Sequence, residues 1–378
     1  MSTPTPPAVA PLASALYYVP RGATEGCSFW RAWRPITVAA EQGARCGWAY
    51  YNDDRSIDHI PRYDLTVFQR LGWQSIKRGE GLVRMLRDAG RVVVQECDDD
   101  IWSNRADQKS EAELGFKDKS ELSPGQNRRS TKLYDGVLVS TERLRTIVNG
   151  FAPNMPVEVV GNYIDLGLWR QLLASEERHP KLAGKRTIGW FGGNRKSRDL
   201  AVMAEAWRRV AIARPDVVFV VQGYVDDVVK DAVPKDRLEI LPWLPVVPRD
   251  GMPFYGVGLL NVDIACCSVA ETAFNAAKTP IKVYEATAAG AAVITSSWLY
   301  GRVVDHGDDG LIADTADEWE AALLRLIDDE PERARMQAAM YAKIAERWSL
   351  ESNWWRFPAA WTALAEEARK RRVRVTAA

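Results

Sequence analysis

Two lysines and a glutamate lie close together in the segment KTPIKVYEATAAG, residues 278–290. Thr279 can cap a helix that ends near the closing glycine, and such a helix start offers unpaired N–H groups and partial positive charge. Lys278 and Lys282 share one face of this helix with Glu285. The set suits a nucleoside diphosphate, with lysines at the phosphates and the carboxylate at ribose hydroxyls. It equally fits a capped helix whose charged face meets only solvent.

A second cationic segment, Gly192–Asp199, follows an expected strand. Its two glycines allow close approach of the backbone to a ligand, and its basic side chains supply positive charge for an anionic group at that point. The alternative is an ordinary surface turn. The candidate residues are Gly192, Gly193, Asn194, Arg195 and Arg198.

Three consecutive aspartates, Asp98–Asp100, follow another expected strand. Carboxylates at the carboxyl end of a parallel strand lie near the ligand in doubly wound sheets. They could bind acceptor hydroxyls, act as a general base or hold a metal, and at least one could simply cap a helix. Asp98 and Asp100 are catalytic candidates, together with Arg195 and Lys282, and Asp99 is a substrate-binding candidate. No metal is inferred from this run.

Short apolar runs alternate with amphipathic segments, which is typical of parallel sheets covered by helices. The pattern restarts after a charged stretch, so we expect two doubly wound α/β units. The expected strands are 15–18, 45–50, 65–68, 91–95, 136–139 and a short one within 153–165, then 187–191, 217–222, 238–241, 262–266 and 292–295. The expected domains are a flexible tail (1–14), a first doubly wound domain (15–168, with a lid or excursion at 101–131), a connector (169–185), a second doubly wound domain (186–350) and a last helix with a basic tail (351–378).

The charge of the chain is balanced, with 50 Lys plus Arg against 50 Asp plus Glu in 378 residues. Balance argues against a dedicated nucleic-acid binder, although a nucleic-acid acceptor stays open. Five cysteines without C-x-x-C spacing favour reduced thiols, so we expect a cytoplasmic protein. The scattered histidines and cysteines predict no metal site, and no apolar stretch is long enough to span a membrane.

Tryptophan is frequent, with 15 copies. Its wide apolar face suits both cores and stacking surfaces. We expect the core to contain Trp190, Trp207, Trp243 and Trp319. The last helix carries Trp354, Trp355 and Trp361. The expected stacking surfaces for a sugar or base are Trp30, Trp33, Trp73 and Trp102.

The second half of the chain resembles a known family. Lys282-Val-Tyr-Glu285, then Gly290-Ala-Ala-Val-Ile294 and Gly307-Asp-Asp-Gly-Leu311, resemble the carboxyl-terminal domain of family 4 (group 1) glycosyltransferases. Ile188-Gly-Trp-Phe-Gly-Gly193 and Gly161-Asn-Tyr-Ile-Asp165 match as well. The resemblance implies a GT-B fold, in which two Rossmann-like doubly wound domains face each other across a cleft. It also implies retention of anomeric configuration. By the same resemblance, the first domain binds the acceptor, the second binds the sugar nucleotide, and the last helix packs back on the first domain.

The resemblance further implies roles for residues in the second half. Glu285 matches the glutamate that binds the donor ribose, and Lys282 matches a lysine three residues before it. A second family glutamate, which holds sugar hydroxyls, would fall at Ala277. Asn275 and Lys278 are therefore expected to take its place.

In the first half, Gly22–Arg31 resembles the family's first glycine-bearing loop. This implies Gly22 in donor binding and Arg31 at the start of the next helix. Asp98 or Asp100 would stand where many family members have a histidine. The expected acceptor-binding set is Trp30, Arg31, Asp99 and Trp102.

We therefore expect a retaining glycosyltransferase with a nucleoside-diphosphate sugar as donor, UDP or GDP being the expected nucleotide, and no required cofactor. The acceptor class stays open between a glycan, a lipid, a protein, a small molecule and a modified DNA base, as does the oligomeric state. Two alternatives remain. One is another GT-B sugar-nucleotide enzyme, such as an epimerase or phosphorylase. The other is a non-catalytic sugar-nucleotide-binding module.

Overall fold

The computed structural model describes residues 13–19, 26–50, 60, 62–69, 73–103, 123–174, 176–192, 197–223, 226–245 and 254–376, with the main chain alone at 73–79, 197 and 374–376. The chain divides into two compact units. Unit 1 comprises Met1–Tyr163, Thr272–Thr279 and Leu350–Ala378, and unit 2 comprises Ile164–Glu271 and Pro280–Ser349.

Unit 1 is built on a sheet of six described strands in the order β2-β1-β3-β4-β5-β6, all paired in parallel. These strands are rich in Val, Leu, Phe and Tyr, and β1, β3, β4 and β5 are buried throughout, as expected for strands covered on both faces. The elements are β1 (Ala15–Val19), α1 (Gly26–Ser28), a π-helical turn (Phe29–Trp33), α2 (Arg34–Glu41), β2 (Cys46–Tyr50), β3 (Leu65–Gln69), α3 (Trp73–Asp88), β4 (Val92–Cys97), α4 (Pro124–Thr131), β5 (Gly136–Val139), α5 (Glu142–Phe151), β6 (Val157–Val159), α10 (Ala273–Ala276), α15 (Leu350–Asn353) and α16 (Arg356–Thr376).

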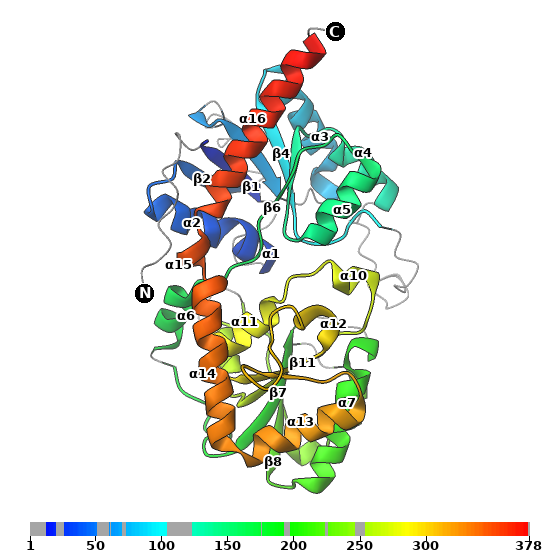
Figure 1. Cartoon of the computed structure of the whole chain (residues 1–378), viewed down its shortest axis with the longest axis vertical. Helices are drawn as coiled ribbons and strands as arrows, with labels where there is room; N and C mark the ends of the chain where they lie inside the picture. The colour runs from blue at the N-terminus through cyan, green and yellow to red at the C-terminus, as the bar shows by residue number, and fades with distance from the viewer. Residues whose placement is uncertain are drawn as a thin grey trace. The chain divides into compact units, whose positions relative to one another are not determined.

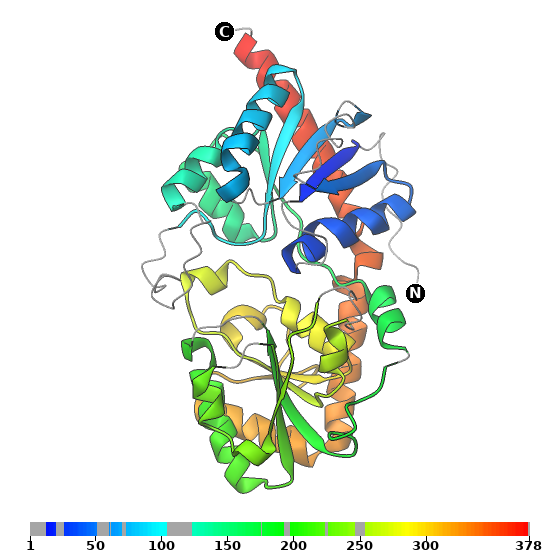
Figure 2. The same cartoon turned by 180° about the vertical axis from the view of Figure 1, so that it is seen from behind.

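Helices cover both faces of the unit 1 sheet. The carboxyl-terminal α16 runs along one face, against β4, β5 and β6, and α3 lies on the opposite face (Figures 1 and 2). Trp361 anchors α16, because its buried indole Nε1 donates a hydrogen bond to the hydroxyl of Tyr17 at 2.9 Å. The last helix of the chain is therefore part of the first unit.

Unit 2 has a sheet of six described strands in the order β12-β11-β10-β7-β8-β9, again parallel. The switch in strand order lies between β7 and β10, which is where doubly wound sheets bind ligands at their carboxyl ends. The elements are α6 (Leu166–Leu173), β7 (Arg186–Gly192), α7 (Ser197–Ala213), β8 (Val217–Gly223), α8 (Asp227–Lys230), a 3-10 turn (Lys235–Arg237), β9 (Leu238–Leu241), α9 (Gly256–Leu259), β10 (Ile264–Cys267), α11 (Ile281–Ala288), β11 (Ala292–Thr295), α12 (Ser297–Tyr300), β12 (Leu311–Ile312), α13 (Ala316–Asp328) and α14 (Glu330–Arg347).

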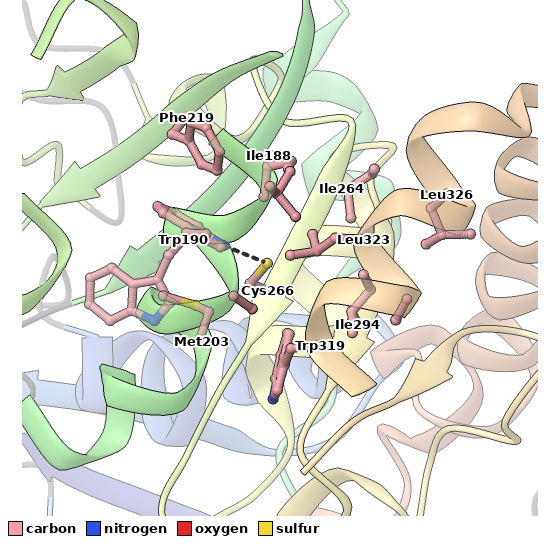
Figure 3. Close-up of a cluster of buried hydrophobic side chains, with 14 of the residues drawn as sticks. Ile188, Trp190, Met203, Phe219, Ile264, Cys266, Ile294, Trp319, Leu323 and Leu326 are labelled. Atoms are coloured by element: carbon pink, nitrogen blue, oxygen red, sulfur yellow. Dashed lines mark hydrogen bonds between the residues drawn. The ribbon is translucent and has the colours of Figure 1, made fainter. Parts of the chain in front are cut away.

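The main core of unit 2 joins β7, β8, β10 and β11 to the apolar faces of α7 and α13 (Figure 3). Trp207 on α7 and Trp319 on α13 are almost fully buried there. The indole Nε1 of Trp207 donates to the sulfur of Cys266 at 3.4 Å, so this polar nitrogen is satisfied inside the core. Helix α13 begins with a capping box between Thr315 and Glu318, which stabilises its first turn.

The predicted doubly wound α/β architecture is confirmed, and the expected strands are present with ends that differ by at most two residues. The short β12 was not predicted. The excursion expected at 101–131 is only partly correct, because Trp102 belongs to the core and Pro124–Thr131 forms α4, while 104–122 lie outside the described residues. Trp243, expected in the core, is 55% exposed.

Candidate functional site

The carboxyl end of β7 in unit 2 brings together a glycine, a lysine and two aromatic rings. Lys282, on α11, is buried, and its Nζ donates to the carbonyl oxygen of Phe191. The same Nζ lies 5.0 Å from the ring centroid of Trp190 and 4.5 Å from that of Phe191. Gly192 follows with a φ of 151°, and a Cβ on it would come within 2.5 Å of Lys282 Nζ. Only glycine leaves room for the ammonium here.

Glu285 lies one turn further along α11 and is also buried. Its Oε1 accepts a hydrogen bond from the hydroxyl of Tyr255. Tyr255 is itself held by Gln222, whose Nε2 donates to its carbonyl oxygen at 2.8 Å, and by the edge of the buried Trp169 ring at 5.7 Å. The Glu285 carboxylate is therefore oriented by a tyrosine that sits thirty residues away in sequence.

No sequence pattern points to Tyr255 as a site residue. Its neighbours supply only a general hint of tight packing, because Gly256 and Gly258 have no space for a Cβ beside Phe254 and Gln222. No fixed spacing relates Tyr255 to Glu285, since the fold of unit 2 alone brings α11 against this segment.

The local charges also act on neighbouring groups. Burial, with the negative charge of Glu285, raises the pKa of Tyr255 well above its ordinary value, so the hydroxyl stays a donor at neutral pH. Burial raises the pKa of Cys267, at the end of β10, to about 12, while Lys282 opposes this shift and Glu285 adds to it. A cation, a carboxylate and a protonated phenol thus converge at the β7–β10 switch point, in a pattern suited to binding phosphate and hydroxyl groups.

The structure describes only some of the remaining candidates for binding the donor in the segment Gly192–Asp199. Arg198 lies in the first turn of α7 and is exposed. Gly193, Asn194 and Arg195 lie outside the described residues, as does Gly22 in the first half of the chain.

The segment Thr272–Thr279 belongs to unit 1. Ala277 packs in the core cluster of Cys97 and Trp102, and its carbonyl oxygen accepts from Thr141 Oγ1 at 3.0 Å. Asn275 is buried in α10. The candidates in this segment therefore belong with residues from the first half of the chain.

Two contacts show this directly. Lys278 Nζ lies 3.2 Å from Asp99 Oδ1 and 4.4 Å from the Phe274 ring centroid. Thr279 Oγ1 accepts from Asn162 Nδ2 at 2.8 Å. The expectation that Thr279 caps the following helix is wrong, because Pro280 is the N-cap of α11 and no side chain caps it.

The three aspartates after β4 differ in their surroundings. Asp100 is buried, and its Oδ1 accepts from the backbone N–H groups of Trp102 at 3.1 Å and Ser103 at 2.9 Å. This is a turn-forming role, one that short polar side chains commonly play. Asp98 and Asp99 are partly exposed. Of the run, these two can meet a ligand at the carboxyl edge of the unit 1 sheet.

Arg31 is fully buried in unit 1. Its Nε donates to Glu96 Oε1 at 2.6 Å, and its Nη1 donates to Val160 O at 2.6 Å and to Asn162 Oδ1 at 2.9 Å. Burial lowers the pKa of Arg31, but the carboxylates of Glu96 and Asp98 outweigh this and raise it above its ordinary value. Arg31 ties the first helical turns to β4 and to the segment after β6, so it is placed to hold structure rather than to meet an acceptor.

The two tryptophans expected to stack on an acceptor are buried as well. Trp102 is completely buried, and its Nε1 donates to Thr131 Oγ1 at 2.8 Å. Trp30 is 7% exposed and packs edge-on against Phe29. The expectation of stacking surfaces at these two positions is corrected, because both rings are enclosed by their own unit.

Within the described residues, no cluster of three or more His, Cys, Asp and Glu side chains has the arrangement of a metal site. None of the described helices is long and apolar enough to cross a membrane.

Three solved structures share the fold of this chain and are distant from it in sequence. Anabaena Alr3699/HepE, solved with UDP and glucose, has a TM-score of 0.58 at 14% identity over 92% of this chain and 98% of its own. The trehalose-6-phosphate synthase OtsA gives 0.60 at 11% identity over 94% and 99%. Sucrose-phosphate synthase from Thermosynechococcus elongatus gives 0.56 at 12% identity over 97% and 99%. The chain therefore has the GT-B fold.

The family comparison is more specific. Residues 185–329 match the family described as glycosyl transferases group 1. The resemblance of this part of the chain to group 1 glycosyltransferases, predicted from Lys282–Glu285 and its neighbours, is confirmed, whereas the assignment to family 4 and the retention of configuration stay predictions. No curated protein matches the chain.

Proposed function

We propose that this protein is a retaining glycosyltransferase that moves a sugar from a nucleoside-diphosphate sugar to an acceptor hydroxyl. The observation that carries the proposal is the buried pair of Lys282 and Glu285 at the β7–β10 switch point, inside a group 1 glycosyltransferase domain. Tyr255 supports it by orienting the carboxylate.

Each residue of this site has a part in the proposal. The ammonium of Lys282 carries three N–H donors, one of which meets Phe191 O, and it attracts the donor diphosphate. Glu285, fixed through one oxygen by Tyr255, accepts hydrogen bonds from ribose hydroxyls. UDP is the preferred nucleotide, because Anabaena Alr3699/HepE was solved with UDP-glucose.

The proposed transfer keeps the anomeric configuration. The bond between the anomeric carbon and the phosphate oxygen breaks, and the acceptor oxygen forms its bond on the same face. The acceptor proton passes to a phosphate oxygen of the donor, so no protein nucleophile is assigned. Positive groups at the diphosphate stabilise the charge on the leaving nucleotide. We propose Asp98 and Asp99 as the groups that bind the acceptor hydroxyl, and the cytoplasm as the location.

A thermal-shift panel of UDP, GDP and their sugars tests the proposal. A ligand at about 100 times its Kd stabilises the folded state by about 2.7 kcal/mol, so the true donor identifies itself. We expect one sugar nucleotide to stabilise the protein and to be slowly hydrolysed to the free nucleotide. Absence of any nucleotide effect contradicts the proposal.

Two variants sharpen this experiment. Glu285→Ala should reduce donor hydrolysis at least about tenfold while the protein stays folded, since it removes the ribose contact. Glu346→Ala, at an exposed glutamate on α14, is the matched control and should keep full activity. Conversion of the sugar nucleotide into another sugar nucleotide without an acceptor would instead identify an epimerase.

A further inference from the structure

A polar cavity of about 340 Å³ lies at the amino edge of the unit 1 sheet. Four of its lining residues come directly before strands, since Ser14 precedes β1, Arg45 precedes β2, Asp64 precedes β3 and Arg91 precedes β4. Ligands of doubly wound sheets bind at the opposite, carboxyl edge. The full lining is Ser14, Arg45, Arg62, Tyr63, Asp64, Gly90, Arg91, Val92 and Arg369.

The wall of this cavity is strongly cationic, with four arginines and a single aspartate. Asp64 is already engaged, because its Oδ2 accepts from Ser14 N at 2.9 Å and Ser14 Oγ at 2.8 Å, and its Oδ1 pairs with Arg369 at 3.1 Å. The backbone N–H of Ser14 is the main cause that holds the pKa of Asp64 below its ordinary value. In the part of the chain that the structure describes, no carboxylate pairs with the other three arginines of the wall.

One guanidinium of the wall and one stretch of its main chain are held by neighbouring groups. The guanidinium of Arg45 donates to the carbonyl oxygen of Arg62 and lies 6.0 Å from the ring centroid of Tyr63. The carbonyl oxygen of Arg91 accepts from Arg372 on α16, which fixes the main chain at that corner of the cavity. A guanidinium held in this way, as that of Arg45 is, loses little freedom when it binds an anion.

We propose that this cavity binds a phosphate group, either of a small phosphorylated metabolite or of a lipid headgroup. Planar guanidinium forks match phosphate oxygens in pairs, which is why arginine is preferred for phosphate recognition. The cavity has the size of a small-ligand site, at the lower end of the usual range of about 300–1,000 Å³. Val92 is the one aliphatic side chain in its lining, so an apolar ligand has little to contact. The inference does not rest on the proposed transferase activity.

Calorimetric titration of the full chain with inorganic phosphate tests this site. The test variant is Arg62→Gln with Arg91→Gln, which removes two charges from the wall. The matched control is Arg84→Gln with Arg143→Gln, two exposed arginines of unit 1 outside the cavity lining. Loss of two charge-assisted hydrogen bonds should weaken binding at least about tenfold in the test variant alone.

Neither double variant changes a residue of unit 2. Phosphate that binds in unit 2 therefore contributes equally to the titrations of both variants. Equal phosphate affinity in the two double variants, or no phosphate binding by the unaltered protein, overturns the proposal. Circular dichroism of the test variant shows whether a loss of binding comes from a loss of folding.

Sedimentation with vesicles distinguishes the two sources of phosphate. With a lipid headgroup as ligand, the protein and the control variant sediment with phosphatidylglycerol vesicles but not with pure phosphatidylcholine, and the test variant stays in solution. With a free metabolite as ligand, none of the proteins sediments with vesicles, although the unaltered protein and the control variant still bind phosphate in calorimetry. Sedimentation of both double variants alike counts against the cavity as the headgroup site.

Discussion

The hydroxyl of Tyr255 donates a hydrogen bond to Oε1 of Glu285, although the two residues come from separate segments of unit 2. The bond fixes the direction of the one carboxylate that α11 offers at the β7–β10 switch point. A carboxylate oriented by a protonated phenol can present its other lone pairs to hydroxyl groups without reorganising. The pair therefore links the packing of the α9 segment to the proposed ribose contact.

Tyr255→Phe should weaken UDP binding by about tenfold, because a hydrogen bond to a charged group contributes roughly 1.5–3 kcal/mol. Calorimetry with UDP measures the effect. Tyr341→Phe, on α14, removes a hydroxyl from the same unit and should leave the affinity unchanged. If Tyr255→Phe binds UDP as well as the unaltered protein, Glu285 is not held by this bond for nucleotide recognition.

Gly192→Ala should also weaken UDP binding, because the new Cβ displaces the ammonium of Lys282, which would lie 2.5 Å away. Gly290→Ala is a matched control, since Gly290 has a φ of 96° but no atom within 4 Å of the methyl group that alanine would add. Both variants should lose about 1 kcal/mol of stability from the left-handed backbone, and only the first should lose affinity. In a Lys282→Ala background, Gly192→Ala should no longer reduce the affinity; a further loss there would show that the lysine is not the group displaced.

The buried ion pair of Arg31 and Glu96 should dominate the stability of unit 1. Glu96→Gln leaves the guanidinium without its charged partner, which costs about 3–5 kcal/mol for a buried pair. Urea denaturation followed by circular dichroism measures the loss. Glu142→Gln breaks the exposed Arg145–Glu142 pair and should cost under about 1 kcal/mol. If the two variants lose similar amounts of unfolding free energy, the buried ion pair stabilises unit 1 no more than the exposed pair does.

The stability of unit 2 should fall in alkaline solution. Burial raises the pKa of Cys267 to about 12, whereas an unfolded thiol ionises near pH 8.5. The folded state therefore keeps a proton that the unfolded state loses, so the free energy of unfolding decreases as pH rises from about 8.5 toward 12. Between about pH 7.5 and pH 9.5, this thiol alone lowers the free energy of unfolding by about 1.4 kcal/mol.

Cys267→Ala should remove that share of the pH dependence in urea denaturation. Val293→Ala, in the neighbouring strand β11, is a control that should lower stability by the same amount at both pH values. An unchanged pH dependence in Cys267→Ala would show that this thiol does not titrate differently in the folded and unfolded states.

The local sequence pattern was enough to predict most of the strands and one helix face that carries site residues. Strands such as Gly136–Val139 and Ala292–Thr295 follow from short β-branched and apolar runs, and the shared face of Lys282 and Glu285 follows from helical spacing. These features depend on residues a few positions apart. Their consequences for backbone conformation are therefore readable from the chain itself.

Tertiary structure decided which side chains are enclosed and which meet across the fold. Parallel sheets join strands through crossovers, so Tyr255 reaches Glu285, and Arg31 reaches Glu96, only when the sheets assemble. The same assembly buries Trp102 and exposes Trp243, although the sequence pattern predicts the reverse for these two tryptophans. Burial depends on which surface a neighbouring segment covers, and that is set by contacts between residues far apart in the chain.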